Sequence, residues 1–228
     1  VLANLFTGRL KPMRNIVTIV FSFTGFLFVI YNLYLYFEGK LEDKIYNIPF
    51  AFFTLQFGFD LYGLVFAALI TLLWGIAAAY SFSYMGTNYP EKSDGLFQFS
   101  YSLSVFFVFC FAFAKNLITM FVIYECLTIA TIALVGFKRN EEVKKGLFTY
   151  LAVLFFCSFL LLLPAILYIE FNVGSIAFDG IGTGFIGRFG IEETTLKILL
   201  FMLVIGVGKA AFFPFHIWLP SAMVAPTP

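Results

Sequence analysis

Residues 201–218 read "FMLVIGVGKAAFFPFHIW", an apolar run that contains one lysine and one proline. Lys209 has no charged neighbour from Leu199 to the end of the sequence. Pro214 follows it by five positions, and the only histidine of the chain, His216, follows it by seven. Such a run is typical of a membrane helix, where a lysine is rare and needs a partner or water.

The whole chain has the composition of a membrane protein. Of its 228 residues, 61% are hydrophobic and only 12% are charged, whereas a soluble domain has about 25% charged residues. Apolar runs of roughly 18 residues or more indicate transmembrane helices. We therefore expect an all-α polytopic membrane protein rather than a β-barrel, because the long uncharged runs do not alternate: 15–37, 61–90, 95–114 and 146–169.

Charge and cysteine content exclude other classes of protein. The net charge of +1 gives no basis for binding nucleic acid. Cys110, Cys126 and Cys157 all lie in apolar runs, without the spacing of a metal site or an iron–sulfur cluster. We expect these cysteines to be packing residues, and we expect no cofactor in this chain.

The order of uncharged runs and charged loops predicts about six to seven transmembrane helices in one membrane domain, 1–228. Asp60 is placed to cap the third helix, and Lys115 could extend its ammonium from the turn between the fourth and fifth helices to the interface. The expected helices cover 15–37, 61–84, 96–114, 117–137, 147–170 and 196–213, after a fragment of one helix in residues 1–8.

The distribution of lysine and arginine predicts orientation in the cell's inner (cytoplasmic) membrane. Cytoplasmic loops carry an excess of these residues. One set of alternate loops holds four of them, and the glycine-rich loop 171–193 belongs to this outer set. The other, cytoplasmic, set holds eight: Arg9, Lys11, Arg14, Lys92, Lys138, Arg139, Lys144 and Lys145.

Two opposite charges lie deep in predicted spans, Glu125 in the fifth helix and Lys209 in the seventh. Either charge at the bilayer centre costs roughly 2.5–3.5 kcal/mol, so we expect the two to face each other. If their distance changes, the proton affinity of the lysine changes with it. The alternative is a fixed ion pair that only holds the two helices together, although buried pairs stabilise weakly.

Residues around Lys209 predict a broken helix. Gly206 and Gly208 precede the lysine, and Pro214 deprives the carbonyl of Ala210 of its helical partner. A break at membrane depth is tolerated where it is buried in protein or lines a water-filled cavity. An ordinary proline kink is the alternative. His216 could relay protons near neutral pH or be a hydrogen-bonded residue at a helix end.

Three stretches resemble one known family. The sequence "GVGKAAFFPFHIWLPSAMVAPTP" (206–228) is similar to the signature of the antiporter-like subunits of respiratory complex I, an NADH:quinone oxidoreductase, and of Mrp cation/proton antiporters and membrane-bound hydrogenases. "KNLITMFVIYECLTIATIALVGF" (115–137) resembles the fifth helix of that family, where an aromatic residue precedes a glutamate. "FGFDLYGLVFAALITLLWGIAAAYSFSYM" (57–85) resembles its third helix, which begins with aspartate.

The resemblance implies a role for each matching residue. Glu125 and Lys209 match the family's glutamate and lysine, a pair whose opening drives proton transfer, and His216 falls in the usual "PFHxWLP" context. Ser221 departs from the acidic residue expected after "WLP". Family members have about fourteen helices in two inverted repeats, so we expect this chain to be the N-terminal half, with helix 1 incomplete and helix 8 onward absent.

These observations predict a non-catalytic, ion-translocating subunit of a redox-driven membrane complex, with electron transfer in partner subunits. Its partners would be other membrane subunits, lipid, and H⁺ or Na⁺. The alternative is a non-conducting structural or assembly subunit that retains the ion pair. A secondary transporter for a small solute is a third reading, which the specific motif around Lys209 disfavours.

Overall fold

The structure is a computed structural model that describes residues 11–41, 44–50, 52–89, 95–138, 140–173, 178, 192–223 and 225. The expected helix fragment in residues 1–8 and most of the glycine-rich loop 171–193 lie outside these residues. Within them, five helices are long and apolar enough to cross a membrane. The expected all-α polytopic membrane fold is therefore confirmed.

The helices follow the expected order with shifted ends. The sixth expected helix, predicted over 147–170, is longer than expected. It forms one continuous helical segment over 141–173 that contains a π-helical turn. The helices are α2 (Lys11–Phe37), α3 (Leu61–Asn88), α4 (Gly95–Ala112), α5 (Leu117–Val135), α6 (Glu141–Cys157), the π-turn (Ser158–Leu162), α7 (Leu163–Val173), α9 (Glu193–Gly206) and α10 (Trp218–Ala222).

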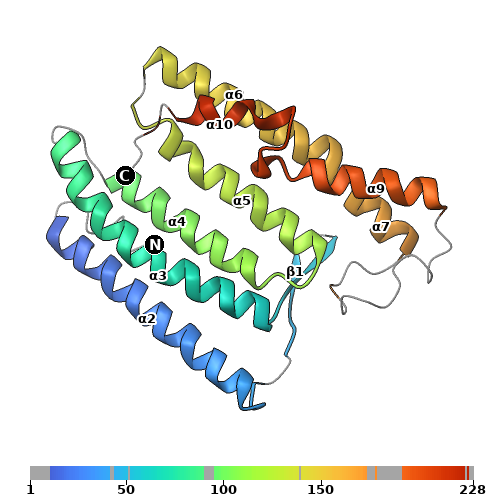
Figure 1. Ribbon diagram of the computed structural model, residues 1–228, viewed down its shortest axis with the longest axis horizontal. Helices are drawn as coiled ribbons and strands as arrows, with labels where there is room; N and C mark the ends of the chain where they lie inside the picture. The colour runs from blue at the N-terminus through green and yellow to red at the C-terminus, as the bar shows by residue number, and fades with distance from the viewer. Residues whose placement is uncertain are drawn as a thin grey trace.

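Consecutive helices lie side by side. Figure 1 shows α2 to α6 in chain order, and each contacts the next. Small and apolar residues allow this packing, since Val29, Leu64, Ala67 and Phe113 form one buried cluster among α2, α3 and the end of α4. Large apolar side chains on the outer surface are exposed, as expected of helices that face lipid.

A β-hairpin interrupts the expected loop between the second and third helices. Strands β1 (Tyr46–Phe50) and β2 (Phe53–Phe57) pair antiparallel, with Ile48 opposite Leu55. Leu55 is buried in a cluster with residues of α5 and α7. The sequence prediction of a loop was wrong here, because aromatic and β-branched residues favour a strand where one face packs on helices.

Hydrogen bonds attach the hairpin to the start of α5. The amide N–H of Gln56 donates to Thr119 Oγ1 at 2.7 Å, and its carbonyl accepts from the amide of Lys115 at 2.9 Å. Asn116 Nδ2 donates to the carbonyl of Thr54 at 3.0 Å. The hairpin therefore holds the turn from which α5 begins.

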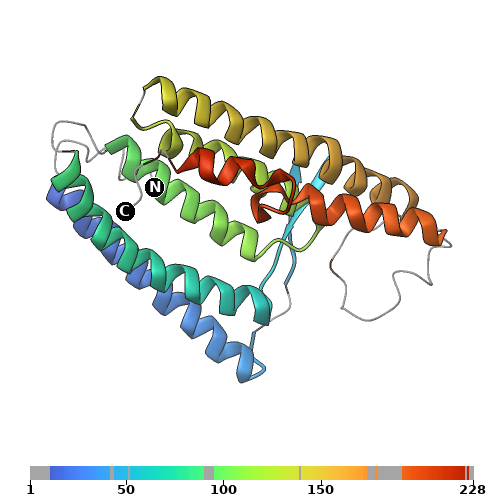
Figure 2. The same cartoon turned by 45° about the horizontal axis from the view of Figure 1, so that its top comes forward.

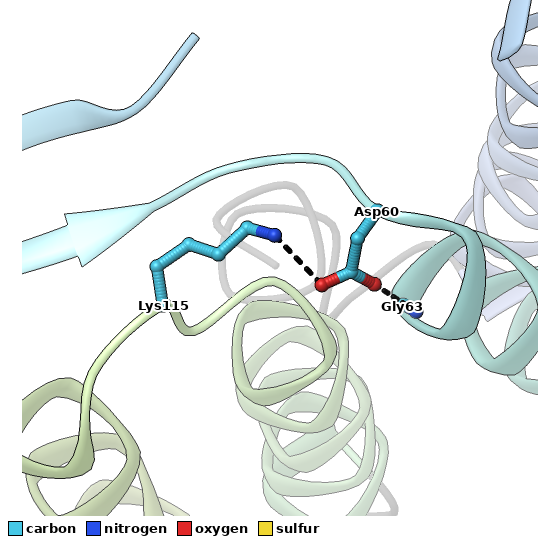
Figure 3. Close-up of polar contacts among 3 residues, drawn as sticks. All are labelled: Asp60, Gly63 and Lys115. Atoms are coloured by element: carbon cyan, nitrogen blue, oxygen red, sulfur yellow. Dashed lines mark hydrogen bonds and ion pairs between the residues drawn. The ribbon is translucent and has the colours of Figure 1, made fainter. Parts of the chain in front are cut away.

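An ion pair joins the same turn to α3 (Figure 3). Asp60 Oδ1 accepts from the amide of Gly63 at 2.6 Å, which confirms the predicted cap. Its other oxygen, Oδ2, lies 2.7 Å from Lys115 Nζ. Lys115 was expected to extend to the interface, but it pairs with Asp60 because both residues stand at helix ends that meet.

The seventh expected helix is shorter than predicted. Helix α9 ends at Gly206 instead of residue 213. One 3₁₀ turn (Gly208–Ala210) and a second (Phe215–Ile217) then lead to α10. Figure 2 shows α9 and α10 along the segment formed by α6 and α7, with the interruption between them. We call residues 207–217 the break.

Candidate ion-translocation site

Lys209 is attached to α5 by its side chain and its backbone. Its Nζ donates to the carbonyl of Tyr124 at 3.2 Å and to Thr128 Oγ1, and it lies 3.6 Å from the centre of the Tyr124 ring. Its amide N–H donates to the Tyr124 hydroxyl at 2.9 Å. An ammonium has three donors and is attracted to an aromatic face, so Tyr124 and Thr128 together form a seat for the cation.

Glu125 lies next to this seat but does not form it. Both carboxylate oxygens are buried, and neither accepts a hydrogen bond within the described part of the chain. No ion pair within 4 Å joins Glu125 to Lys209, although the two lie close enough for their charges to interact. Successive helical residues point about 100° apart, so Tyr124 receives the ammonium while the adjacent Glu125 points to another side.

The expected direct pairing of Glu125 and Lys209 therefore differs from the geometry. The structure places Lys209 against α5 beside Glu125, so the two opposite charges lie near each other as expected. The ammonium, however, is held by a carbonyl, a hydroxyl and an aromatic ring. Glu125 is left with Ser158 of the π-turn as a polar neighbour.

Hydrogen bonds within and around the break stabilise part of its backbone without a continuous helix. Trp218 Nε1 donates to the carbonyl of Gly208 at 2.8 Å, and the amide of Ala211 donates to the same carbonyl at 3.0 Å. Ala211 has φ 52°, a left-handed conformation, which turns the chain out of the helical path. Gly206 and Gly208 are both buried.

Pro214 and His216 lie beyond the point where the helix ends. Pro214 precedes the second 3₁₀ turn, eight residues after Gly206. The expectation that it ends the helix by depriving Ala210 of a partner is therefore wrong, since the helix has already ended. His216 is exposed, and its ring stacks on Phe213 with centroids 5.8 Å apart. It does not touch the Lys209 seat.

Several residues of the site were not predicted from the sequence. Tyr124 and Thr128 are four positions apart, so they share one face of α5, and that spacing next to Glu125 was a usable signal. Ser158 and Trp218 had no comparable signal, because tertiary packing brings them to the break. Among the described residues, no group of three His, Cys, Asp or Glu side chains could hold a metal ion.

The sequence of this chain is similar to those of known membrane proteins. A relative from Staphylococcus haemolyticus, named as antiporter subunit mnhA2, is 30% identical over 197 residues, which cover 84% of this chain and 24% of the relative. The protein of the same name from Staphylococcus aureus is 31% identical over 201 residues, with 83% and 24% covered. The chain thus spans about a quarter of the length of the curated relatives it matches.

The fold and the sequence both match an established group. A chain in the structure of the membrane-bound sulfane sulfur reductase, an archaeal respiratory membrane complex, superposes with a TM-score of 0.73 at 16% identity. The match covers 98% of this chain and 46% of that one. The profile of one family matches residues 114–228, half of the chain and all of the site. The protein is therefore a multi-pass membrane protein of the family described as NADH:quinone oxidoreductase/Mrp antiporter, TM.

Proposed function

We propose that this chain translocates H⁺, or exchanges Na⁺ for H⁺, by means of Lys209 and Glu125. The observation that carries the proposal is a buried carboxylate that has no hydrogen-bond partner among the described residues and lies beside a lysine seated on uncharged groups. Ionisable side chains inside a membrane are costly and mark ion or proton paths. A pure stabilising role would be better served by direct contact or by apolar residues.

In the proposed mechanism, the ammonium of Lys209 alternates between two positions. In the seat, Lys209 contacts the carbonyl of Tyr124 and the hydroxyl of Thr128. In the second position it would contact the carboxylate of Glu125. The proton affinity of a lysine depends on the charge it faces, so movement between the two positions would couple to proton binding and release. His216 would be a relay further along the path.

The comparisons support a role inside a larger assembly. The relatives carry the name of an antiporter subunit, and the structural match belongs to a respiratory membrane complex. We propose that this chain works with other membrane subunits in the cytoplasmic membrane and receives energy through its contacts with them. Redox chemistry would belong to those partners, and this chain would carry no cofactor.

A structural role is the second candidate, and one observation favours it. Lys209 connects the break to α5 through both its backbone and its side chain. Such a connection would hold α5 and α9 together even in a subunit that conducts no ions.

Substitution in the complete protein separates the two functions. We expect Lys209→Ala and Glu125→Gln each to lower ion flux in vesicles by about tenfold or more, which is a change of about 1.4 kcal/mol in the barrier. Flux is measured with a pH-sensitive dye, and assembly is measured on native gels. Lys144→Ala is the control, because Lys144 forms an exposed pair with Glu141 at 2.6 Å.

The outcomes point to different functions. Reduced flux with normal assembly supports translocation. Normal flux and normal assembly in both variants would exclude these residues as carriers. Loss of assembly in Lys209→Ala, with normal flux through the complexes that do form, would favour the structural role.

A further inference from the structure

Gly206, the last residue of α9, packs directly against the π-turn, and Gly208, in the break, packs against Cys157 immediately before that turn. A Cβ atom added to Gly206 would lie 2.7 Å from the backbone nitrogen of Leu162 and 2.8 Å from its Cα. A Cβ atom added to Gly208 would lie 2.9 Å from Cys157 Cβ and 3.3 Å from its Sγ. Carbon atoms in contact are normally about 3.5–4.0 Å apart, so neither position has room for a side chain.

Backbone conformation does not require these glycines. Glycine is often used where φ is positive, but in the described part of the chain only Gly39 has a positive φ among glycines. Gly206 and Gly208 adopt φ values open to any residue. Their role is therefore to let the two segments approach closely, whereas the sequence alone indicated only that they lie beside a helix break.

The π-turn reaches both ionisable residues of the site. At one end, Ser158 is the polar neighbour of Glu125. Cys157, immediately before this end, contacts Gly208, and at the other end Leu162 contacts Gly206. Gly208 is followed directly by Lys209. A π-turn adds one residue to a helix and is frequent at functional sites, and here it bridges Glu125 and the break.

We propose that the π-turn, Gly206 and Gly208 are positioning elements that set the distance between Lys209 and its seat on α5. A methyl group at residue 206 meets the backbone of Leu162, which cannot rotate away. The break would have to withdraw by several tenths of an ångström to about 1 Å. The contact of Nζ with the Tyr124 carbonyl is already 3.2 Å long, and it would then exceed hydrogen-bond distance.

The test uses Gly206→Ala in the complete protein, and it rests on the proposed function. Gly86→Ala is the matched control, since Gly86 is also in an apolar helix and a Cβ there meets nothing within 4 Å. We expect Gly206→Ala to assemble, to lower flux about tenfold and to displace the pH of half-maximal flux by about 0.5 unit or more. A merely structural defect would reduce the amount of assembled protein without moving that pH.

Three outcomes test the positioning role of the glycines separately from the proposed function. A wild-type rate and pH profile in assembled Gly206→Ala, when Lys209→Ala has lost flux, would overturn the positioning role and leave the proposed function intact. Unchanged flux in Lys209→Ala would overturn both. If Gly206→Ala does not accumulate, Gly208→Ala decides in its place, because its Cβ meets side-chain atoms of Cys157 and Leu154 rather than backbone atoms. A wild-type profile there also overturns the role.

Discussion

Lys209 is a partly buried cation whose contacts are dipoles and a π-face. The carbonyl of Tyr124, the hydroxyl of Thr128 and the Tyr124 ring replace part of the hydration that the ammonium loses. A cation–π contact contributes roughly 0.5–2 kcal/mol. An uncharged seat binds the ammonium less firmly than a direct carboxylate would, as the proposed movement of Lys209 between the seat and Glu125 requires.

Thr128 is the residue of the seat that can be altered with least change in shape. It is fully buried and its hydroxyl contacts Lys209 Nζ. We expect Thr128→Val to preserve assembly and to lower ion flux about fivefold to tenfold, because a buried hydrogen bond to a charged group contributes roughly 1.5–3 kcal/mol. Flux in vesicles at a series of pH values is the measurement.

Thr149→Val is the matched control for this prediction. The hydroxyl of Thr149 lies at an exposed position and donates to the carbonyl of Lys145 in its own helix, away from the seat. An identical flux in Thr128→Val and Thr149→Val would show that the seat has no part in transport.

At the scale of elements, the ends of α3 and α5 and the hairpin meet at one junction. Asp60 caps α3 and pairs with Lys115, while the hairpin bonds the turn that contains Lys115. Because Glu125 lies on α5 and the turn sets where α5 begins, this junction supports the site from a distance.

Substitutions at Asp60 separate the cap from the ion pair. Asp60→Asn keeps an oxygen acceptor for the amide of Gly63 but removes the charge, and a partly exposed pair contributes at most about 1 kcal/mol. Asp60→Ala removes both, and loss of the cap adds about 0.5–2 kcal/mol. We expect the thermal unfolding midpoint in detergent to fall in the order wild type, Asn, Ala.

Glu141→Gln is the control for these measurements. It removes an exposed pair with Lys144, so its midpoint should remain near that of the wild type. Equal midpoints for Asp60→Asn and Asp60→Ala would refute a separate contribution from the cap.

At the scale of the whole molecule, orientation is a prediction that labelling can check. The distribution of lysine and arginine places Lys40 outside and Lys144 in the cytoplasm. Both side chains are exposed, 64% and 66% respectively. We expect a membrane-impermeant maleimide applied to intact cells to label Lys40→Cys and not Lys144→Cys.

The unsubstituted chain measures background labelling, because it contains free Cys110, Cys126 and Cys157. In inverted vesicles the pattern should be reversed. Labelling of Lys144→Cys from outside intact cells would reverse the predicted orientation.

Much of the fold follows from the sequence by itself. Uncharged runs determine the helices, because backbone groups in lipid must bond within their own segment, and the starts of α3 and α5 agree with the expected positions to the residue. The same argument selected Glu125 and Lys209, since deep charges are costly and therefore few. The family resemblance rested on these residues and was confirmed by the profile match to residues 114–228.

Only the tertiary structure decided how the site is built. It placed the ammonium of Lys209 on Tyr124 and Thr128, ended α9 at Gly206 well before Pro214, and packed Gly206 against a π-turn and Gly208 against Cys157 just before it. Hydropathy along a chain indicates which residues enter the membrane, but it contains little information on which face of a helix contacts which neighbouring helix. Those contacts depend on distances of a few tenths of an ångström between segments far apart in sequence, and packing alone determines them.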